Sequence, residues 1–135
     1  MRALLDTHCW LWWISAPERL SDEALEAIRY GGNEIYFSAA SSWEISIKAT
    51  LGKLVMPDKP SEFIPSRLAR DGILPLPIQH AHAFQVAGLP LFHLDPFDRM
   101  LVAQAQVENL TLLTVDRQIE KYDVSLLFCG KSGQF

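Results

Sequence analysis

The chain has 135 residues, enough for one domain with a substantial core but too few for two. Hydrophobic residues make up 49% and charged residues 21%, which is an ordinary globular composition. The formal net charge of -4 argues against a general nucleic-acid coat protein, which would be basic, but it is compatible with a nuclease whose acids surround a metal ion.

Neither a membrane segment nor a signal peptide is predicted. The apolar stretches are shorter than the ~18–20 residues of a membrane helix, and the N-terminal run meets Asp6 too early for a signal peptide. Cys9 and Cys129 form neither a CxxC motif nor a Cys/His metal-binding spacing. We therefore expect a cytoplasmic protein with two reduced thiols.

Short β-rich runs alternate with helical stretches along the chain. The predicted strands are residues 2–5, 34–38, 73–76, 110–115 and 125–128. The predicted helices are residues 7–14, 22–30, 40–51, 61–70, 78–87, 95–108 and 117–122. Ser21 and Ser61 are expected N-caps, and Pro75 suits an edge strand because proline cannot donate to a strand ladder. This alternation predicts an α/β fold with a parallel sheet, in a single domain over residues 1–130 followed by a loose tail at 131–135.

Two acids follow apolar strands. Asp6 comes directly after the first predicted strand, and Asp116 comes directly after the fourth. Ligands bind at the carboxyl ends of parallel strands, so both carboxylates are expected at the ligand-binding edge of the sheet. Thr7 and Thr114 could orient a carboxylate or a bound water there. An acid after a strand is also a common helix N-cap, so capping alone remains an alternative for each.

Two further acids are expected on helices that follow strands. Glu44 lies among apolar residues, where an acid is costly without a partner or an ion, although it could form an i,i+4 ion pair with Lys48. Asp98 lies in the first turn of a helix that has Asp95 as N-cap and Pro96 as its first residue. Its side chain would also face the strand ends, whereas Asp95 is better explained as a cap. Carboxylates without basic partners repel one another unless a divalent cation holds them.

The histidines and tryptophans are predicted to be structural. The histidines show no metal-ligand spacing and are expected to be ordinary surface or core residues: His8, His80, His82 and His93. The tryptophans are expected in the core or at an interface: Trp10, Trp12, Trp13 and Trp43. The apolar run at residues 10–13 suggests more apolar surface than a small domain buries, which favours a homodimer.

Four motifs run in order along nearly the whole chain. They are Met1-Arg2-Ala3-Leu4-Leu5-Asp6-Thr7-His8, then Ser42-Trp43-Glu44-Ile45-Ser46-Ile47-Lys48 with Leu51-Gly52-Lys53-Leu54, then His93-Leu94-Asp95-Pro96-Phe97-Asp98-Arg99-Met100, and finally Thr114-Val115-Asp116. Together they resemble the PIN domain, and in particular the VapC-type toxins of bacterial toxin–antitoxin pairs. The resemblance implies a three-layer sandwich with a five-stranded parallel sheet, in the order 3-2-1-4-5, flanked by helices.

The resemblance also implies a site and an activity. It places the family's acidic quartet on four residues: Asp6, Glu44, Asp98 and Asp116. Its supporting hydroxyl falls on Thr114, and Asp95 is either an auxiliary ligand or only a cap. The implied activity is that of an endoribonuclease that depends on Mg²⁺ or Mn²⁺. The implied partners are an RNA substrate, a second copy of the chain, and a small VapB-like DNA-binding antitoxin whose tail lies over the site.

Hard carboxylate ligands suit Mg²⁺, which keeps several waters and bridges to phosphate oxygens. A bound ion would direct water at a phosphodiester, leaving a 5′-phosphate and a 3′-hydroxyl. Asp6 and Asp116 are the expected primary ligands, and Glu44 and Asp98 are expected to complete the shell. Contacts to the acids or to phosphate are expected from two basic side chains: Lys48 and Arg99.

Two other functions remain open. The acidic pocket could belong to a binding module that docks a basic partner peptide without turnover, and hydrolysis after addition of Mg²⁺ would exclude that function. The chain could also be a DNA nuclease on the same fold, although it lacks insertions that would clamp a duplex.

Overall fold

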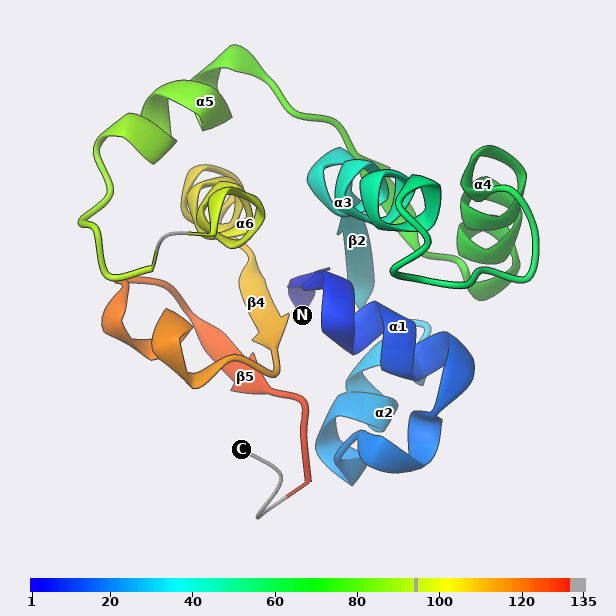
Figure 1. Cartoon of the computed structure of the whole chain (residues 1–135). Coiled ribbons are helices and arrows are strands. Elements are labelled where there is room, and N and C mark those ends of the chain that lie inside the picture. Colours follow the sequence, from blue (N-terminus) through cyan, green and yellow to red (C-terminus); the bar gives the residue numbers. More distant parts are fainter. Residues whose placement is uncertain (94, 132–135) are drawn as a thin grey trace.

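The computed structural model describes residues 1–93 and 95–131 (Figure 1). At its centre is a five-stranded parallel sheet in the order β3-β2-β1-β4-β5, which confirms the predicted fold class and strand order. The strands are β1 (Arg2–Leu5), β2 (Glu34–Ser38), β3 (Leu74–Leu76), β4 (Thr111–Thr114) and β5 (Leu126–Phe128). The predicted loose tail at residues 131–135 lies outside the described residues from position 132 onward.

The order of the strands reverses at β1. The chain adds β2 and β3 on one side of β1, then crosses over to add β4 and β5 on the other. Leu5 is in register with Phe37 of β2 and with Leu113 of β4, so these three strands end at the same edge. In open parallel sheets a ligand binds at this edge, where the strand order reverses.

The sheet is covered on both faces by helices. The α-helices are α1 (Thr7–Ser15), α2 (Asp22–Arg29), α3 (Ala39–Thr50), α4 (Pro60–Asp71), α5 (His80–Ala87) and α6 (Pro96–Glu108), and Pro17–Arg19 and Arg117–Lys121 are 3-10 helices. Figure 1 shows α1 and α2 on one side of the sheet and α5 and α6 on the other. Ala3, Leu4 and Leu5 are fully buried, as expected for a central strand covered on both faces. Among the described residues, no helix combines the length and the apolar character needed to cross a membrane.

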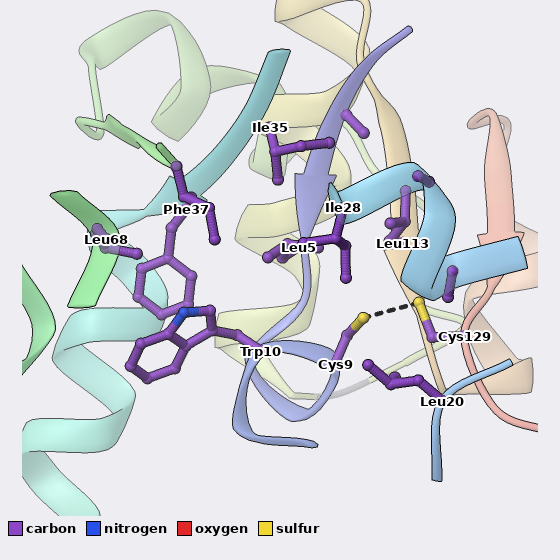
Figure 2. Packing of buried hydrophobic residues seen from close by; sticks show 14 of the residues in the cluster. Leu5, Cys9, Trp10, Leu20, Ile28, Ile35, Phe37, Leu68, Leu113 and Cys129 are labelled. Atoms are coloured by element: carbon purple, nitrogen blue, oxygen red, sulfur yellow. Dashed lines mark hydrogen bonds between the residues drawn. The ribbon is translucent and has the colours of Figure 1, made fainter. Parts of the chain in front are cut away.

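One core lies between the sheet and helices α1, α2 and α4. The indole of Trp10 is fully buried, and its centroid lies 4.6 Å from that of the Phe37 ring (Figure 2). The sulfur atoms of Cys9 and Cys129 face each other at 2.8 Å, and both cysteines are free, as predicted. Because Cys9 and Trp10 lie early in α1, this core fixes the start of the helix that follows β1.

A second core lies on the opposite face, between the sheet and α6. Leu101 and Val102 of α6 are buried there with Leu4 of β1 and Leu112 of β4. The packing holds the first turn of α6 next to the ends of the two central strands. The sheet edge and the start of α6 are therefore fixed relative to each other by buried apolar surface.

Two local expectations are corrected by the structure. Ser61 does not cap α4, because the helix begins at Pro60 without a side-chain cap, and a proline at the first helical position already has a helical φ angle. Helix α1 is less buried than predicted, since Trp12 and Trp13 are only half-buried. The Arg19 guanidinium covers the Trp12 ring, 4.3 Å from its centroid, and replaces some of the apolar cover that a buried helix would have.

Candidate functional site

Two carboxylates lie at the reversal point of the sheet. Asp6 follows β1 and caps α1: its Oδ1 accepts the N–H of Cys9 at 2.6 Å, and its Oδ2 accepts the N–H of Val115 at 3.0 Å. Asp116 comes just after β4, and its Oδ1 accepts the N–H of Gln118 at 2.9 Å. Because β1 and β4 are adjacent and parallel, both acids lie at one edge of the sheet. Both are therefore helix caps and candidate site residues at once.

Helices α3 and α6 contribute the other two predicted acids. Asp95 caps α6, since its Oδ1 accepts the N–H groups of Phe97 at 2.8 Å and of Asp98 at 3.0 Å. Asp98 therefore lies in the first turn of α6, as predicted. Glu44 of α3 is 7% exposed, and the Nζ of Lys48 donates to its Oε2 at 2.7 Å. The predicted ion pair between them is present, at the wall of the same pocket.

A single pocket of about 210 Å³ contains all four predicted acids. Its lining residues are Asp6, Thr7, His8, Glu44, Lys48, His93, Asp95, Asp98, Val115 and Asp116. They come from the ends of β1 and β4, the first turn of α1, the middle and the last turn of α3, the start of α6 and the segment just before α6. Residues as far apart as positions 6 and 116 are thus brought together by the strand order of the sheet.

Crowding of the acids changes their protonation. Burial, followed by the negative charges of Asp95 and Asp6, raises the pKa of the Asp98 carboxyl to about 7. The charge of Glu44 adds to this rise, whereas His93 opposes it. Burial also raises the pKa of Asp6, although hydrogen bonds from neighbouring groups oppose that rise. The pocket therefore holds more negative charge than the protein neutralises, which is a setting that attracts a cation.

The two predicted hydroxyls have different roles. Thr114 hydrogen-bonds the Asp6 carboxylate, and its Oγ1 also accepts the N–H of Asp116 at 3.0 Å. Thr7 donates instead to the Oγ of Ser41 at 2.9 Å, a buried contact that joins α1 to α3. Thr114 therefore supports a carboxylate directly, whereas Thr7 helps to hold the pocket walls together.

Arg99 does not line the pocket, contrary to the expectation from sequence. Its guanidinium donates to the hydroxyl of Tyr122 at 3.2 Å. It also donates to three carbonyl oxygens: Val86 at 3.1 Å, Leu89 at 3.4 Å and Pro90 at 2.8 Å. These carbonyls lie at the end of α5 and just beyond it, where the negative end of the helix dipole attracts a cation. Arg99 therefore stabilises the segment that leads to α6 and is not available to bind the acids or phosphate.

His93 lies in the pocket, although the sequence analysis assigned it to ordinary surface or core positions. Its Nε2 lies 2.7 Å from Oδ2 of Asp116 and 3.2 Å from Oδ2 of Asp98. The candidate ligand atoms of these three residues all lie within 4.8 Å of one another. One feature of the sequence could have indicated this position. His93 comes two residues before the helix cap Asp95, and a segment that places Asp95 at the pocket also places His93 near it.

The donor set fits a hard divalent cation. Carboxylate oxygens are the protein ligands that Mg²⁺ and Mn²⁺ prefer. Asp6, Asp98 and Asp116 present carboxylates to one small pocket, and Glu44 adds a fourth from α3. The raised pKa of Asp98 shows that burial and like charges disfavour its ionised form, and a bound cation would reverse that effect. Among the described residues, His93, Asp98 and Asp116 bring candidate ligand atoms within 4.8 Å of one another, and Asp6 and Glu44 present further carboxylates to the same pocket.

The chain matches one family model and is similar to two named ribonucleases. The family model described as "PIN domain" matches residues 3–125. Ribonuclease VapC16 of Mycobacterium tuberculosis is 48% identical over 66 residues, and that match covers 47% of each protein, about half the length of this relative. Ribonuclease VapC22 of the same organism is 29% identical over 120 residues, covering 88% of this chain and 90% of the relative.

Solved structures share the fold. A chain in the crystal structure of VapBC2 from Rickettsia felis, bound to a DNA fragment from its promoter, superposes with a TM-score of 0.70 at 17% identity. The superposition covers 94% of this chain and 98% of that one. At this identity the likeness concerns the fold, and the family match over residues 3–125 supplies the assignment. The chain therefore belongs to the PIN domain family.

Proposed function

We propose that this PIN-domain protein is a metal-dependent endoribonuclease that acts as the toxin of a VapC-type toxin–antitoxin pair. The observation that carries the proposal is the convergence of Asp6, Glu44, Asp98 and Asp116 in one pocket, where the pKa of Asp98 is raised to about 7. The names of the two relatives, both ribonucleases, support RNA as the substrate.

The proposed mechanism assigns the acids to a cation site. Asp6, Asp98 and Asp116 would hold Mg²⁺ or Mn²⁺, with Glu44 binding the ion or orienting its waters. Such an ion supplies charge for phosphate oxygens and activates water for attack on phosphorus. The hydrogen bonds that Asp6 and Asp116 accept from backbone N–H groups hold their carboxylates in place before any ion binds. Lys48 can leave Glu44 to contact an incoming phosphate, because its side chain is 43% exposed.

The proposed partner is a small VapB-like antitoxin. An apolar groove of about 480 Å³ runs between α3, α4 and β3, and its floor includes Ile64, Leu68 and Ile73. Helix α3 separates this groove from the acidic pocket, with Ser42 and Ser46 toward the groove and Glu44 toward the pocket. An apolar segment of the antitoxin would fill the groove, and a basic tail would cross α3 to reach the acids. The solved neighbour is itself a VapBC complex, which supports a partner of this kind.

The proposed assembly is a homodimer, but the apolar surface that supports it is not the one predicted from the sequence. Trp10 is fully buried, and the guanidinium groups of Arg19 and Arg29 lie over the half-buried rings of Trp12 and Trp13, so the run at residues 10–13 offers less apolar surface than expected. Helix α3 and its C-cap instead expose three apolar residues one turn apart on one face: Trp43 at 60%, Ile47 at 38% and the C-cap Leu51 at 62%. An exposed apolar stripe of this kind suits a protein interface.

A cleavage assay tests the proposal. Purified protein is incubated with RNA, with single-stranded DNA and with duplex DNA, in Mg²⁺, in Mn²⁺ and in excess EDTA. We expect cleavage of RNA in either metal and no cleavage in EDTA, with loss of activity in Asp6→Asn. Equal cleavage of RNA in EDTA would contradict the metal mechanism. Preferential cleavage of DNA would make the protein a DNA nuclease, and no cleavage of any substrate would favour a binding module.

A further inference from the structure

We propose that His93 is a positioning residue whose Nε2–H holds the carboxylate of Asp116, and that it is not a ligand of the metal ion. The inference rests on the proposed function in one respect, that this carboxylate binds a cation.

The hydrogen bond at the far side of the ring fixes the tautomer. The backbone N–H of Asp95 donates to Nδ1 of His93 at 3.2 Å. A ring nitrogen that accepts a hydrogen bond carries no proton, so the proton of the neutral imidazole lies on Nε2. The nitrogen that faces the carboxylates is therefore a donor.

This arrangement is the reverse of that around a metal-binding histidine. A histidine that ligates a metal normally donates its other ring N–H to a carboxylate, a carbonyl or water. In His93 the other nitrogen faces the N–H of Asp95, a donor. If Nε2 coordinated a metal, the ring proton would have to lie on Nδ1, where it would face the N–H of Asp95, another donor. The alternative is an imidazole without any ring proton. The geometry therefore disfavours coordination and favours donation.

The carboxylate of Asp116 gains a fixed orientation from its contact with His93. Nε2 lies 2.7 Å from Oδ2 of Asp116, while Oδ1 of the same residue accepts the N–H of Gln118 at 2.9 Å. Each oxygen of Asp116 is thus held by one donor. A carboxylate has about four lone-pair sites, so each oxygen keeps one for a cation. Nε2 also lies 3.2 Å from Oδ2 of Asp98, so the ring lies between the end of β4 and the start of α6 while its one N–H donates to Asp116.

The backbone of His93 is held independently of the acids. Its N–H donates to the hydroxyl of Tyr122 at 2.9 Å, and the same hydroxyl accepts from Arg99 at 3.2 Å. Tyr122 is buried in the core between the sheet and α6, and the side chain of His93 is only 15% exposed. The ring therefore occupies its position through the fold, which is what a positioning group requires.

The experiment uses Mn²⁺ alone as the probe. Pulsed EPR of Mn²⁺ bound to the wild-type protein detects any directly coordinated imidazole nitrogen. We expect bound Mn²⁺ without such a nitrogen coupling. A coupling from a directly bound nitrogen that disappears in His93→Gln would overturn the inference while leaving the metal site intact. Failure of the wild type to bind Mn²⁺ would instead overturn the proposed function together with this inference.

Three variants test the positioning role. His93→Leu removes the donor, and we expect Mn²⁺ affinity to fall by about 10–100-fold. His93→Gln places an amide N–H near the position of Nε2, and we expect it to recover most of the affinity and to recover kcat for RNA cleavage in parallel. His80→Leu makes the same change at an exposed histidine that does not line the pocket, and we expect it to bind Mn²⁺ as the wild type does.

Melting curves in EDTA show whether each variant is folded. Equal Mn²⁺ affinity in His93→Leu and the wild type would overturn the inference. The inference would also be overturned if both variants are folded and His93→Gln binds Mn²⁺ no more tightly than His93→Leu. The size of the His93 side chain, and not its N–H donor, would then explain the loss of affinity. If His93→Leu does not fold, the nitrogen coupling in the wild type and the behaviour of His93→Gln still decide the question.

Discussion

The Oδ1 of Asp95 accepts the backbone N–H of Asp98 at 3.0 Å, so the residue that caps α6 also places a negative charge beside the next acid of the helix. Burial, and then the charges of Asp95 and Asp6, raise the pKa of Asp98 to about 7. The acid that is ordinarily ionised well below neutrality therefore titrates near physiological pH in the metal-free protein.

Cation affinity should rise with pH up to about 7 and level off above it. Asp98 must lose its proton to bind a cation, so below its pKa a proton competes with the metal for the same oxygens. Isothermal titration with Mn²⁺ at about pH 6 and about pH 8 should show roughly tenfold weaker binding at the lower value for one displaced proton. The control is Asp98→Asn, whose weaker binding should depend less on pH. Equal affinity of the wild type at both values would contradict the prediction.

Asp98→Asn should stabilise the metal-free protein at about pH 8 by about 1–4 kcal/mol. The native pKa lies above the unfolded value of 3.8, so the native state binds more protons between these values and its stability falls as pH rises through that window. Denaturant unfolding in EDTA measures the difference. The difference in stability between the variant and the wild type should vanish near about pH 4, where Asp98 is protonated in the native state and resembles asparagine. A variant that is less stable than the wild type at about pH 8 would show that the charge of Asp98 does not destabilise the fold.

Asp116→Asn should behave in the opposite way. Its two carboxylate oxygens accept from Gln118 and from His93, and an amide can satisfy only one of these donors. We therefore expect no gain in stability without metal, but a loss of about 1–3 kcal/mol, together with loss of RNA cleavage. Parallel unfolding curves of Asp116→Asn and Asp98→Asn in EDTA make the comparison. Stabilisation by both variants would mean that charge repulsion outweighs the hydrogen bonds at Asp116.

Lys48→Met should weaken RNA cleavage less than any substitution in the acidic quartet. Lys48 donates to Glu44 at 2.7 Å and can supply charge to phosphate, but it cannot bind a cation. We expect a higher KM for RNA and equal or tighter binding of Mn²⁺, because a positive charge has left the pocket. Steady-state kinetics and Mn²⁺ titration on the same preparation give both values. A loss of kcat as large as that of Asp6→Asn would show that Lys48 acts in the chemical step.

Ser46→Arg should reduce binding of the cognate antitoxin while RNA cleavage continues. Ser46 is exposed on the wall of the apolar groove, so a long charged side chain there would occupy the groove without disturbing the core. Ser66→Arg is the matched control, since Ser66 is exposed on α4 and does not line the groove. Affinities measured with the purified antitoxin should fall for the first variant and not for the second. Unchanged affinity in Ser46→Arg would place the antitoxin on another surface.

Local patterns in the sequence determined much of the fold. A fully apolar run before Asp6 predicted a central strand covered on both faces, because a half-exposed strand would alternate with polar residues. The Asp95-Pro96 pair predicted the start of α6, since both residues act on the backbone within a single turn. The cap of α4 was missed because Ser61 and Pro60 are both good starting residues, and the helix began at the proline.

The composition of the pocket was decided by tertiary structure. His93 lies in a segment without periodic pattern, and its partner Asp116 is 23 positions away, so no local rule connects them. Arg99 follows an acid of the quartet, yet its guanidinium binds the carbonyls beyond α5, which only the packing of α5 on α6 brings near. The pKa of Asp98 depends on burial and on four neighbouring groups, of which Asp6 and Glu44 lie in distant segments of the chain. Hydrogen bonds and electrostatic energies depend on distance in space, and the strand order of the sheet, more than the spacing of residues along the chain, sets those distances here.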